Sequence, residues 1–73
     1  REKLHINYHA KDKCNTEFRI TDITGKEMIY RKVKSDAGNN QYKIDISKLG
    51  PGTYMLQMRT DYTFENCKII VLK

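Results

Sequence analysis

The stretch YKIDISKLGPGTYMLQM, residues 42–58, contains two segments in which apolar and polar side chains alternate. A period of two places every second side chain on one face of an extended chain, as in a half-buried β-strand. Between the segments, Pro51 stands between Gly50 and Gly52, a composition typical of a turn. The stretch therefore predicts two neighbouring β-strands joined by a turn. The side chains expected to face inward are Tyr42, Ile44, Ile46, Tyr54, Leu56 and Met58.

The same alternation recurs in three more segments, near residues 4–8, 17–21 and 27–33, and helical spacing is nowhere sustained. Residues 68–73 add a segment of strand-forming residues without interruption. Segments spaced about 8–12 residues apart are typical of all-β proteins. The sequence therefore predicts an all-β fold, an antiparallel β-sandwich of about seven strands. A seventh, short strand is expected near residues 11–14 or 33–36. The further residues expected in the core are Leu4, Ile6, Phe18, Ile20 and Phe64.

Two other breaks carry turn chemistry. In DITGKE, residues 22–27, Gly25 can take the left-handed conformation that closes a hairpin. DAGNNQ, residues 36–41, is expected to form a longer polar loop. Because Gly25 and Gly52 both lie at strand junctions, we expect positive φ at each.

Size and charge restrict the class of protein. Seventy-three residues make one small domain, and 14 basic against 9 acidic residues give a net charge of +5. No run of about 18 apolar residues is present that could span a membrane. Nucleic-acid binding requires clustered cations with exposed aromatic side chains, whereas these cations are spread over every segment, and Tyr8, Tyr42 and Tyr54 share the parity of inward aliphatic neighbours. We therefore expect no nucleic-acid partner.

The candidate catalytic and metal-binding groups are sparse. His5 and His9 lie on one side of an extended strand, and a metal site there would need a third ligand such as Cys14 or Asp12. Two solvent-facing histidines fit the pattern better. The serines lack a histidine or a nucleophile elbow nearby, and the aspartates lie at turns, where carboxylates bond backbone N–H groups. We expect no enzyme, no cofactor, no metal and no small-molecule substrate.

The two cysteines, Cys14 and Cys67, allow two interpretations. A disulfide would close a loop of 52 intervening residues and could stabilise the fold by about 4 kcal/mol. Alternatively, both are buried thiols that act as small apolar groups.

Both ends of the sequence lie in or near predicted strands. Arg1 is followed within a few residues by a strand pattern, which suggests a domain of a longer protein with an N-terminal partner. KIIVLK, residues 68–73, closes the sequence, which suggests that this end itself has a role.

Several motifs in a fixed order resemble one family. DITGKEMI at residues 22–29 is followed by a glycine and an asparagine, then by YKIDISKLGPGTYMLQM and CKIIVLK. This order is similar to that of the C-terminal sorting domain of the type IX secretion system, from about residue 4 to residue 73. The turn residues that carry the resemblance are Gly25, Lys26, Gly38, Asn39 and Gly52.

The resemblance implies a fold, a location and a set of partners. Residues 1–73 would form one immunoglobulin-like sorting domain behind an exported passenger. The passenger would pass through the periplasm to the cell surface or extracellular space of a Gram-negative bacterium. The expected partners are the outer-membrane translocon, its shuttle components and a sortase-like cysteine endopeptidase, which cleaves the domain and attaches the passenger to the surface. The Asn-Pro pair that often precedes the first strand, and the cleavage linker, are absent from this sequence.

The last predicted strand is the expected recognition element. An edge strand offers unpaired N–H and C=O groups to which a partner can add its own strand, with alternate side chains giving specificity. Such edges would also permit a dimer. The residues expected to be read are Lys68, Ile69, Ile70, Val71, Leu72 and Lys73.

Two other functions remain open on the sequence. One is an extracellular carbohydrate- or adhesin-type binding module, for which Tyr62 is the clear exposed aromatic candidate. The other is a structural spacer domain.

Overall fold

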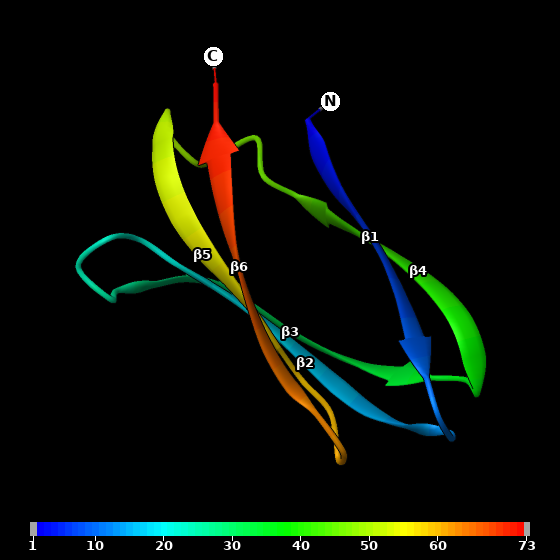
Figure 1. Cartoon of the computed structure of the whole chain (residues 1–73). Helices are drawn as coiled ribbons and strands as arrows, with labels where there is room; N and C mark the ends of the chain where they lie inside the picture. The colour runs from blue at the N-terminus through cyan, green and yellow to red at the C-terminus, as the bar shows by residue number, and fades with distance from the viewer. Residues whose placement is uncertain (1, 73) are drawn as a thin grey trace.

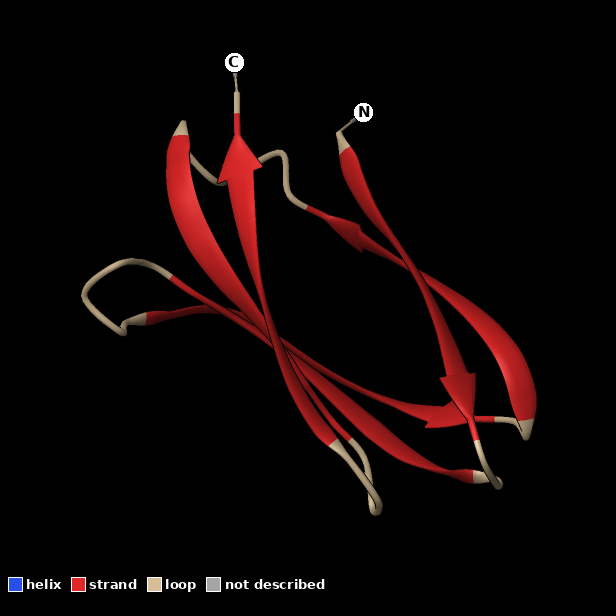
Figure 2. Ribbon diagram, in the orientation of Figure 1, coloured by secondary structure: helices blue, strands red, loops and turns tan. Residues whose placement is uncertain are grey.

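The computed structural model describes residues 2–72, which form six β-strands and no helix (Figure 2). The strands are β1 (Lys3–Ala10), β2 (Cys14–Thr21), β3 (Glu27–Ser35), β4 (Gly38–Asp45), β5 (Gly52–Arg59) and β6 (Phe64–Val71). Across this part of the chain, no helix is long and apolar enough to cross a membrane.

The strands form two antiparallel sheets. The smaller contains β1 and β4, and the larger has the order β3-β2-β5-β6 (Figure 1). The chain changes sheet between β1 and β2, between β3 and β4, and between β4 and β5. The prediction of an antiparallel all-β fold with two sheets is therefore confirmed.

The predicted count of about seven strands is wrong for the described residues. The two segments proposed for a seventh strand belong to other elements. Residues 11–13 form the bend before β2, which begins at Cys14, and Val33–Ser35 is the last part of β3. Cys14 and Val33–Ser35 belong to β2 and β3 because the ladder between these two strands continues to the pair Cys14 and Ser35.

The core lies between the sheets and is centred on Phe18. This ring is fully buried; it stacks on Tyr42 with ring centroids 5.1 Å apart and meets the edge of Tyr8 at 5.5 Å. Aromatic pairs of this geometry add to the free energy gained by burying apolar surface. Phe18 on β2 thus contacts both strands of the smaller sheet.

The predicted core is largely correct. Six of its members are buried and the others are half-buried, with Phe64 as the exception. Phe64 is 52% exposed because it pairs with Arg59 on the outer face of the larger sheet. The buried members are Phe18, Ile20, Ile44, Tyr54, Leu56 and Met58, and the half-buried ones are Leu4, Ile6, Tyr42 and Ile46.

Hydroxyl groups link the two sheets at one end of the core. Ser35 Oγ lies 2.6 Å from the Tyr8 hydroxyl and 2.7 Å from Thr16 Oγ1. Thr16 and Ser35 are buried, and no buried side-chain N or O atom in residues 2–72 lacks a hydrogen-bond partner. The network satisfies these polar groups, which would otherwise be costly to bury.

The hairpin between β2 and β3 is held by one carboxylate. Asp22 Oδ1 accepts hydrogen bonds from the Thr24 hydroxyl at 2.6 Å, the Thr24 N–H at 2.9 Å and the Lys26 N–H at 3.0 Å. Gly25 follows with φ of 90°, and Gly52 has φ of 148°, so both predictions of positive φ are confirmed.

The predicted long loop at residues 36–41 is wrong. Only Asp36 and Ala37 lie outside strands, and Gly38 and Asn39 open β4. The turn is short because the Asn40 side chain braces it: its amide donates to the Asp36 carbonyl at 2.9 Å, and its oxygen accepts from the Asp36 N–H at 3.1 Å.

Replacing Gly25 by alanine should lower the free energy of unfolding by about 1 kcal/mol, because a side chain disfavours positive φ. No atom lies within 4 Å of the added Cβ, so the cost arises from the backbone alone. Urea denaturation measures this difference. Gly50→Ala is the matched control, since its added Cβ also meets open space and its φ is not positive. Equal stability of the two variants would contradict the prediction.

The hairpin should also respond to acid through Asp22. The Thr24 hydroxyl, followed by the Lys26 N–H, holds the pKa of this carboxyl below its ordinary value of 3.8. The carboxylate therefore contributes stability above about pH 3.8, and this contribution is lost as the pH falls through the lowered pKa. Asp22→Asn keeps a hydrogen-bond acceptor but not the charge. Because wild type also loses this charge on protonation, the difference in unfolding free energy between wild type and Asp22→Asn should shrink as the pH falls through this range. Asp12→Asn, exposed in another turn, serves as control. If the curves of unfolding free energy against pH are parallel for wild type and Asp22→Asn, the charge of Asp22 does not stabilise the hairpin.

Candidate functional site: the edge strand β6

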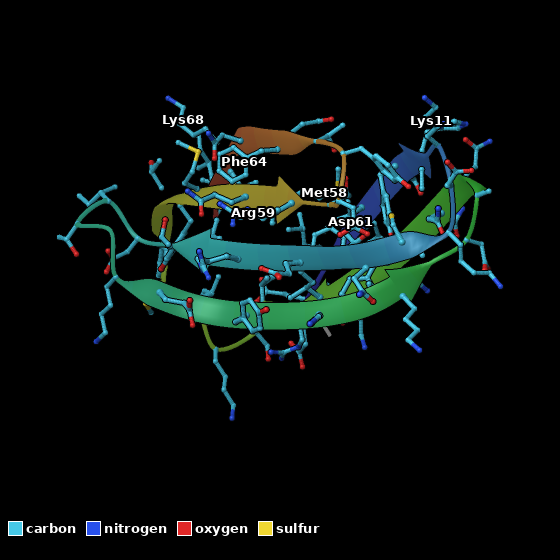
Figure 3. The ribbon with its side chains drawn as sticks, turned by 90° about the horizontal axis from the view of Figure 1, so that it is seen from below. Lys11, Met58, Arg59, Asp61, Phe64 and Lys68 are labelled. Atoms are coloured by element: carbon cyan, nitrogen blue, oxygen red, sulfur yellow. The ribbon has the colours of Figure 1, made fainter. Side chains whose placement is uncertain are left out.

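Strand β6 lies at the edge of the larger sheet. It pairs with β5 on one side, and no described strand pairs with its other side. Figure 3 shows the four strands side by side, with β6 at one end of the row. The backbone groups directed to that side are therefore available to a partner.

The two faces of β6 differ. Ile69 and Val71 pair with Tyr54 and Gly52 and face the core, where Val71 is only 5% exposed. Lys68 and Ile70 lie on the outer face, and Ile70 is 62% exposed. Among the residues expected to be read, the core-facing pair thus anchors the strand, while the outer pair is open to a partner. Leu72 follows the strand and is exposed, and Lys73 lies outside the described residues.

An apolar groove of about 270 Å³ separates β6 from β1. It arises because the four-stranded sheet is wider than the two-stranded sheet, which leaves the inner side of β6 partly uncovered. Glu65 and Cys67 show this: they share the inward parity of Met58 and Leu56, their partners on β5, yet both are exposed. The apolar lining consists of Leu4, Ile6, Tyr8, Leu56, Met58 and Ile69.

The two cysteines are free, so the interpretation as a disulfide is wrong, and only Cys14 is buried as a small apolar group. The register explains this. Cys67 pairs with Leu56, which in turn pairs with Ile20, whereas Cys14 lies six residues before Ile20 on the same strand. This offset is roughly 20 Å along a strand, far beyond the Cα separation that a disulfide spans. Strand β6 is therefore not tied to β2 by a covalent bond.

The outer face of the larger sheet carries two arginines stacked on aromatic rings, which the sequence analysis missed. Arg59 lies 5.3 Å from the ring centroid of Phe64, and Arg19 lies 5.5 Å from that of Tyr30. Such stacking is attractive by about 0.5–1 kcal/mol at exposed sites. Figure 3 labels Arg59 and Phe64 on adjacent strands. Only the strand register could have revealed these pairs, because their members lie 5 and 11 residues apart in the sequence.

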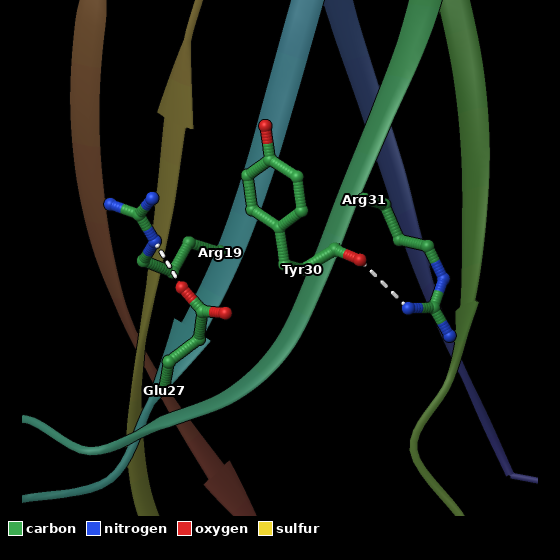
Figure 4. A network of polar contacts seen from close by, with 4 residues as sticks. All are labelled: Arg19, Glu27, Tyr30 and Arg31. Atoms are coloured by element: carbon green, nitrogen blue, oxygen red, sulfur yellow. Dashed lines mark hydrogen bonds and ion pairs between the residues drawn. The ribbon is translucent and has the colours of Figure 1, made fainter.

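Arg19 also forms an exposed ion pair. Its Nε lies 2.7 Å from Glu27 Oε1, while the Arg31 Nη1 atom donates to the Tyr30 carbonyl at 2.8 Å (Figure 4). An ion pair with both side chains near half exposure contributes little stability. Its effect is to neutralise Arg19. Arg59 also lies opposite an acidic residue, because it pairs with Glu17 of β2.

The turn residues named in the sequence analysis lie at three separate hairpins or junctions. Gly25 and Lys26 close the β2–β3 hairpin, Gly38 and Asn39 open β4, and Gly52 opens β5. Of these, only Gly52 adjoins the candidate site, since it pairs with Val71 at the end of β6. The others support the fold.

The residues considered as metal ligands or catalytic groups do not gather at one place in the described structure. His5 and His9 are exposed on β1, and residues 2–72 contain no cluster of three potential metal ligands. Asp45 bonds backbone as expected of a turn aspartate: the Ser47 N–H donates to it at 2.9 Å and holds its pKa below the usual value.

The two faces of β6 predict effects of very different size from an introduced charge on stability. Val71→Asp would bury an unpaired carboxylate and should lower the free energy of unfolding by about 3 kcal/mol or more. Ile70→Asp places the same group in water and should change it by less than about 1 kcal/mol. Urea denaturation of both variants measures the contrast. Similar losses in the two variants would mean that Ile70 is covered in solution.

Comparison with known proteins identifies a family. The profile of the family described as "Secretion system C-terminal sorting domain" matches residues 1–72. No curated protein and no solved structure matches the chain. Because the profile covers the sequence up to its penultimate residue, the chain belongs to this family and is a C-terminal sorting signal of the type IX secretion system, which directs export to the cell surface or extracellular space.

Proposed function

We propose that the secretion machinery reads this signal through strand β6, by adding an extended segment of its own to the free edge. The observation that carries the proposal is that β6 forms the edge of the larger sheet and exposes Ile70 on its outer face. Strand addition uses backbone hydrogen bonds for affinity and alternate side chains for specificity. Lys68 and Ile70 supply those side chains, while Ile69 and Val71 hold the strand to the core.

The contrast between the two edges of the larger sheet supports this choice. Strand β3, at the other edge, carries Arg31, Lys32 and Lys34, all exposed. Charged side chains, lysine above all, are the usual protection of an edge against pairing. In β6, Lys68 is the one cation. Strand β6 is therefore the less protected edge, which suits a recognition element.

The fate of the passenger is part of the same proposal. A passenger joined ahead of β1 crosses the outer membrane of a Gram-negative bacterium through the translocon, assisted by shuttle components. A sortase-like cysteine endopeptidase then cleaves between passenger and domain and attaches the passenger to the surface. The start of β1 and the end of β6 lie at the same end of the sandwich (Figure 1), so one assembly can reach both the cleavage point and the signal.

An immunoglobulin-like fold is also proposed for the domain. The two antiparallel sheets and the changes of sheet along the chain agree with such a sandwich. The six described strands are one fewer than the seven of the constant-type immunoglobulin domain.

The alternative of a carbohydrate- or adhesin-type module has no support. Tyr62 is 57% exposed, but it stands at the tip of the β5–β6 hairpin, and the family assignment points to sorting. A dimer through edge strands would bring like charges together on β3, since its exposed side chains include three cations.

A fusion experiment tests recognition through β6. A reporter with a leader is joined ahead of residues 1–73 and expressed in hosts with and without the translocon. Wild type should reach the surface only where the translocon is present, whereas deletion of residues 68–73 and Ile70→Asp should leave the reporter in the periplasm. Ile70→Asp is the sharper variant because the domain remains folded. The measurement is the surface fraction of the reporter.

Controls separate recognition from folding and from charge. Ile23→Asp makes the same change at an 83% exposed isoleucine in the β2–β3 turn, and it should be exported normally. Val71→Asp should not be exported, because its domain should no longer fold. Lys73→Ala removes one charge and shows whether the last residue is read. Normal export of both the deletion and Ile70→Asp would remove the basis for reading through β6.

A further inference from the structure

We infer that the segment added to β6 alternates apolar and acidic residues, with the apolar side chains over the groove beside β1 and the acidic ones on the outer face. This inference rests on the proposed function and deepens it, because it assigns the chemistry of the partner. Two independent observations carry it: the groove left by the narrow sheet, and the distribution of charge along β5 and β6.

The groove determines the inward side chains of the partner. A strand paired with the free edge of β6 continues the alternation of the sheet, so every second residue faces the same side as Cys67 and Ile69. That side opens onto the groove of about 270 Å³ lined by Leu4, Ile6 and Tyr8 of β1. Apolar side chains placed there would remove this surface from water, which is favourable.

The outer face determines the remaining side chains. On this face, β6 carries Phe64, Asn66, Lys68 and Ile70, and β5 carries Thr53, Met55, Gln57 and Arg59. Two of these residues are cations and none is acidic. Glu65, the one acidic residue of β6, has the opposite parity. Acidic side chains on the outer side of an added strand would therefore meet Lys68 of β6, whereas on the inner side they would meet Glu65; Arg59 lies one strand further in, opposite Glu17 of β2.

Charge also distinguishes this partner from a second copy of the chain. Two β6 strands paired antiparallel would bring both Lys68 side chains onto one face of a continuous sheet. Like charges at this spacing repel, and each chain carries a net charge of +5. The free edge thus favours an acidic strand from another protein. Since β6 has eight residues, the segment it can pair is of about that length.

Cys67 provides a native probe of this geometry. It is exposed, it lines the groove, and it shares the inward parity of β6. The probes are nine-residue peptides of alternating valine and glutamate, each with one cysteine at a different position, carried as a mixed disulfide with glutathione. Attack by the Cys67 thiolate forms a protein–peptide disulfide and releases glutathione. Mass spectrometry of the full chain measures the trapped fraction.

Trapping should alternate with the position of the peptide cysteine. Inward-facing positions should be trapped about tenfold more than their neighbours, because successive residues of a strand face opposite sides. Peptides with lysine in place of glutamate should be trapped poorly. Lys68→Glu should reverse this preference, whereas Lys11→Glu, exposed in the β1–β2 turn, should not. Cys67→Ser should abolish trapping, which excludes Cys14 as the nucleophile.

Three results would overturn the inference. Trapping that does not alternate would show that the peptide is not paired as a strand. Equal trapping of lysine and glutamate peptides would refute the charge assignment. Disulfide-linked dimers that form through Cys67 and outcompete the peptide would assign the edge to a second copy. If trapping fails while Ile70→Asp still blocks export, the proposed chemistry of the partner is wrong but recognition through β6 stands. If trapping alternates while Ile70→Asp is exported normally, β6 can pair with such a strand but is not the element that the secretion machinery recognises.

Discussion

The ladder between β2 and β5 is the constraint on which the rest of the structure depends. Strands β2 and β3 form one hairpin and β5 and β6 another, and only the pairing of Glu17–Thr21 with Met55–Arg59 joins them into a single sheet. The same pairing places Phe18 and Ile20 beside Met58 and Leu56 on the inner face. Because these residues are far apart in the sequence, the ladder costs more chain entropy to form than either hairpin. The position of β6 at the sheet edge follows from it.

The unequal width of the two sheets gives β6 its properties. Four strands face two, so the inner side of β6 is not fully covered, and residues of inward parity such as Cys67 lie exposed at a groove. A larger second sheet would have buried this strand. The architecture therefore leaves one apolar surface incomplete next to an unpaired backbone edge, which is a combination that a partner strand can complete.

The sequence predicted the strands and most of the core, because alternation is a local property. Ile44, Tyr54 and Leu56 are buried as their parity requires. Alternation did not place Phe64, because FENCKIIV does not alternate cleanly, and the register with β5 was needed to assign Phe64 to the outer face. Nor could alternation exclude a Cys14–Cys67 disulfide, since the offset of roughly 20 Å along the strand direction follows from two successive registers. The groove could not be predicted from alternation either, because it depends on how many strands each sheet contains. Motif order pointed to the family, but the edge position of β6 came from the structure.

The two ends of the sandwich differ in one further respect. The start of β1 and the end of β6 share one end of the sandwich (Figure 1). The hydroxyl network of Tyr8, Thr16 and Ser35 lies near the end of β1, the start of β2 and the end of β3. A protein fused ahead of β1 therefore leaves the domain at the same end as the end of β6, whatever its own size or shape. Under the proposed reading through β6, the position of that strand relative to the fused protein does not depend on the surface of the fused protein, so unrelated cargoes can share one recognition element.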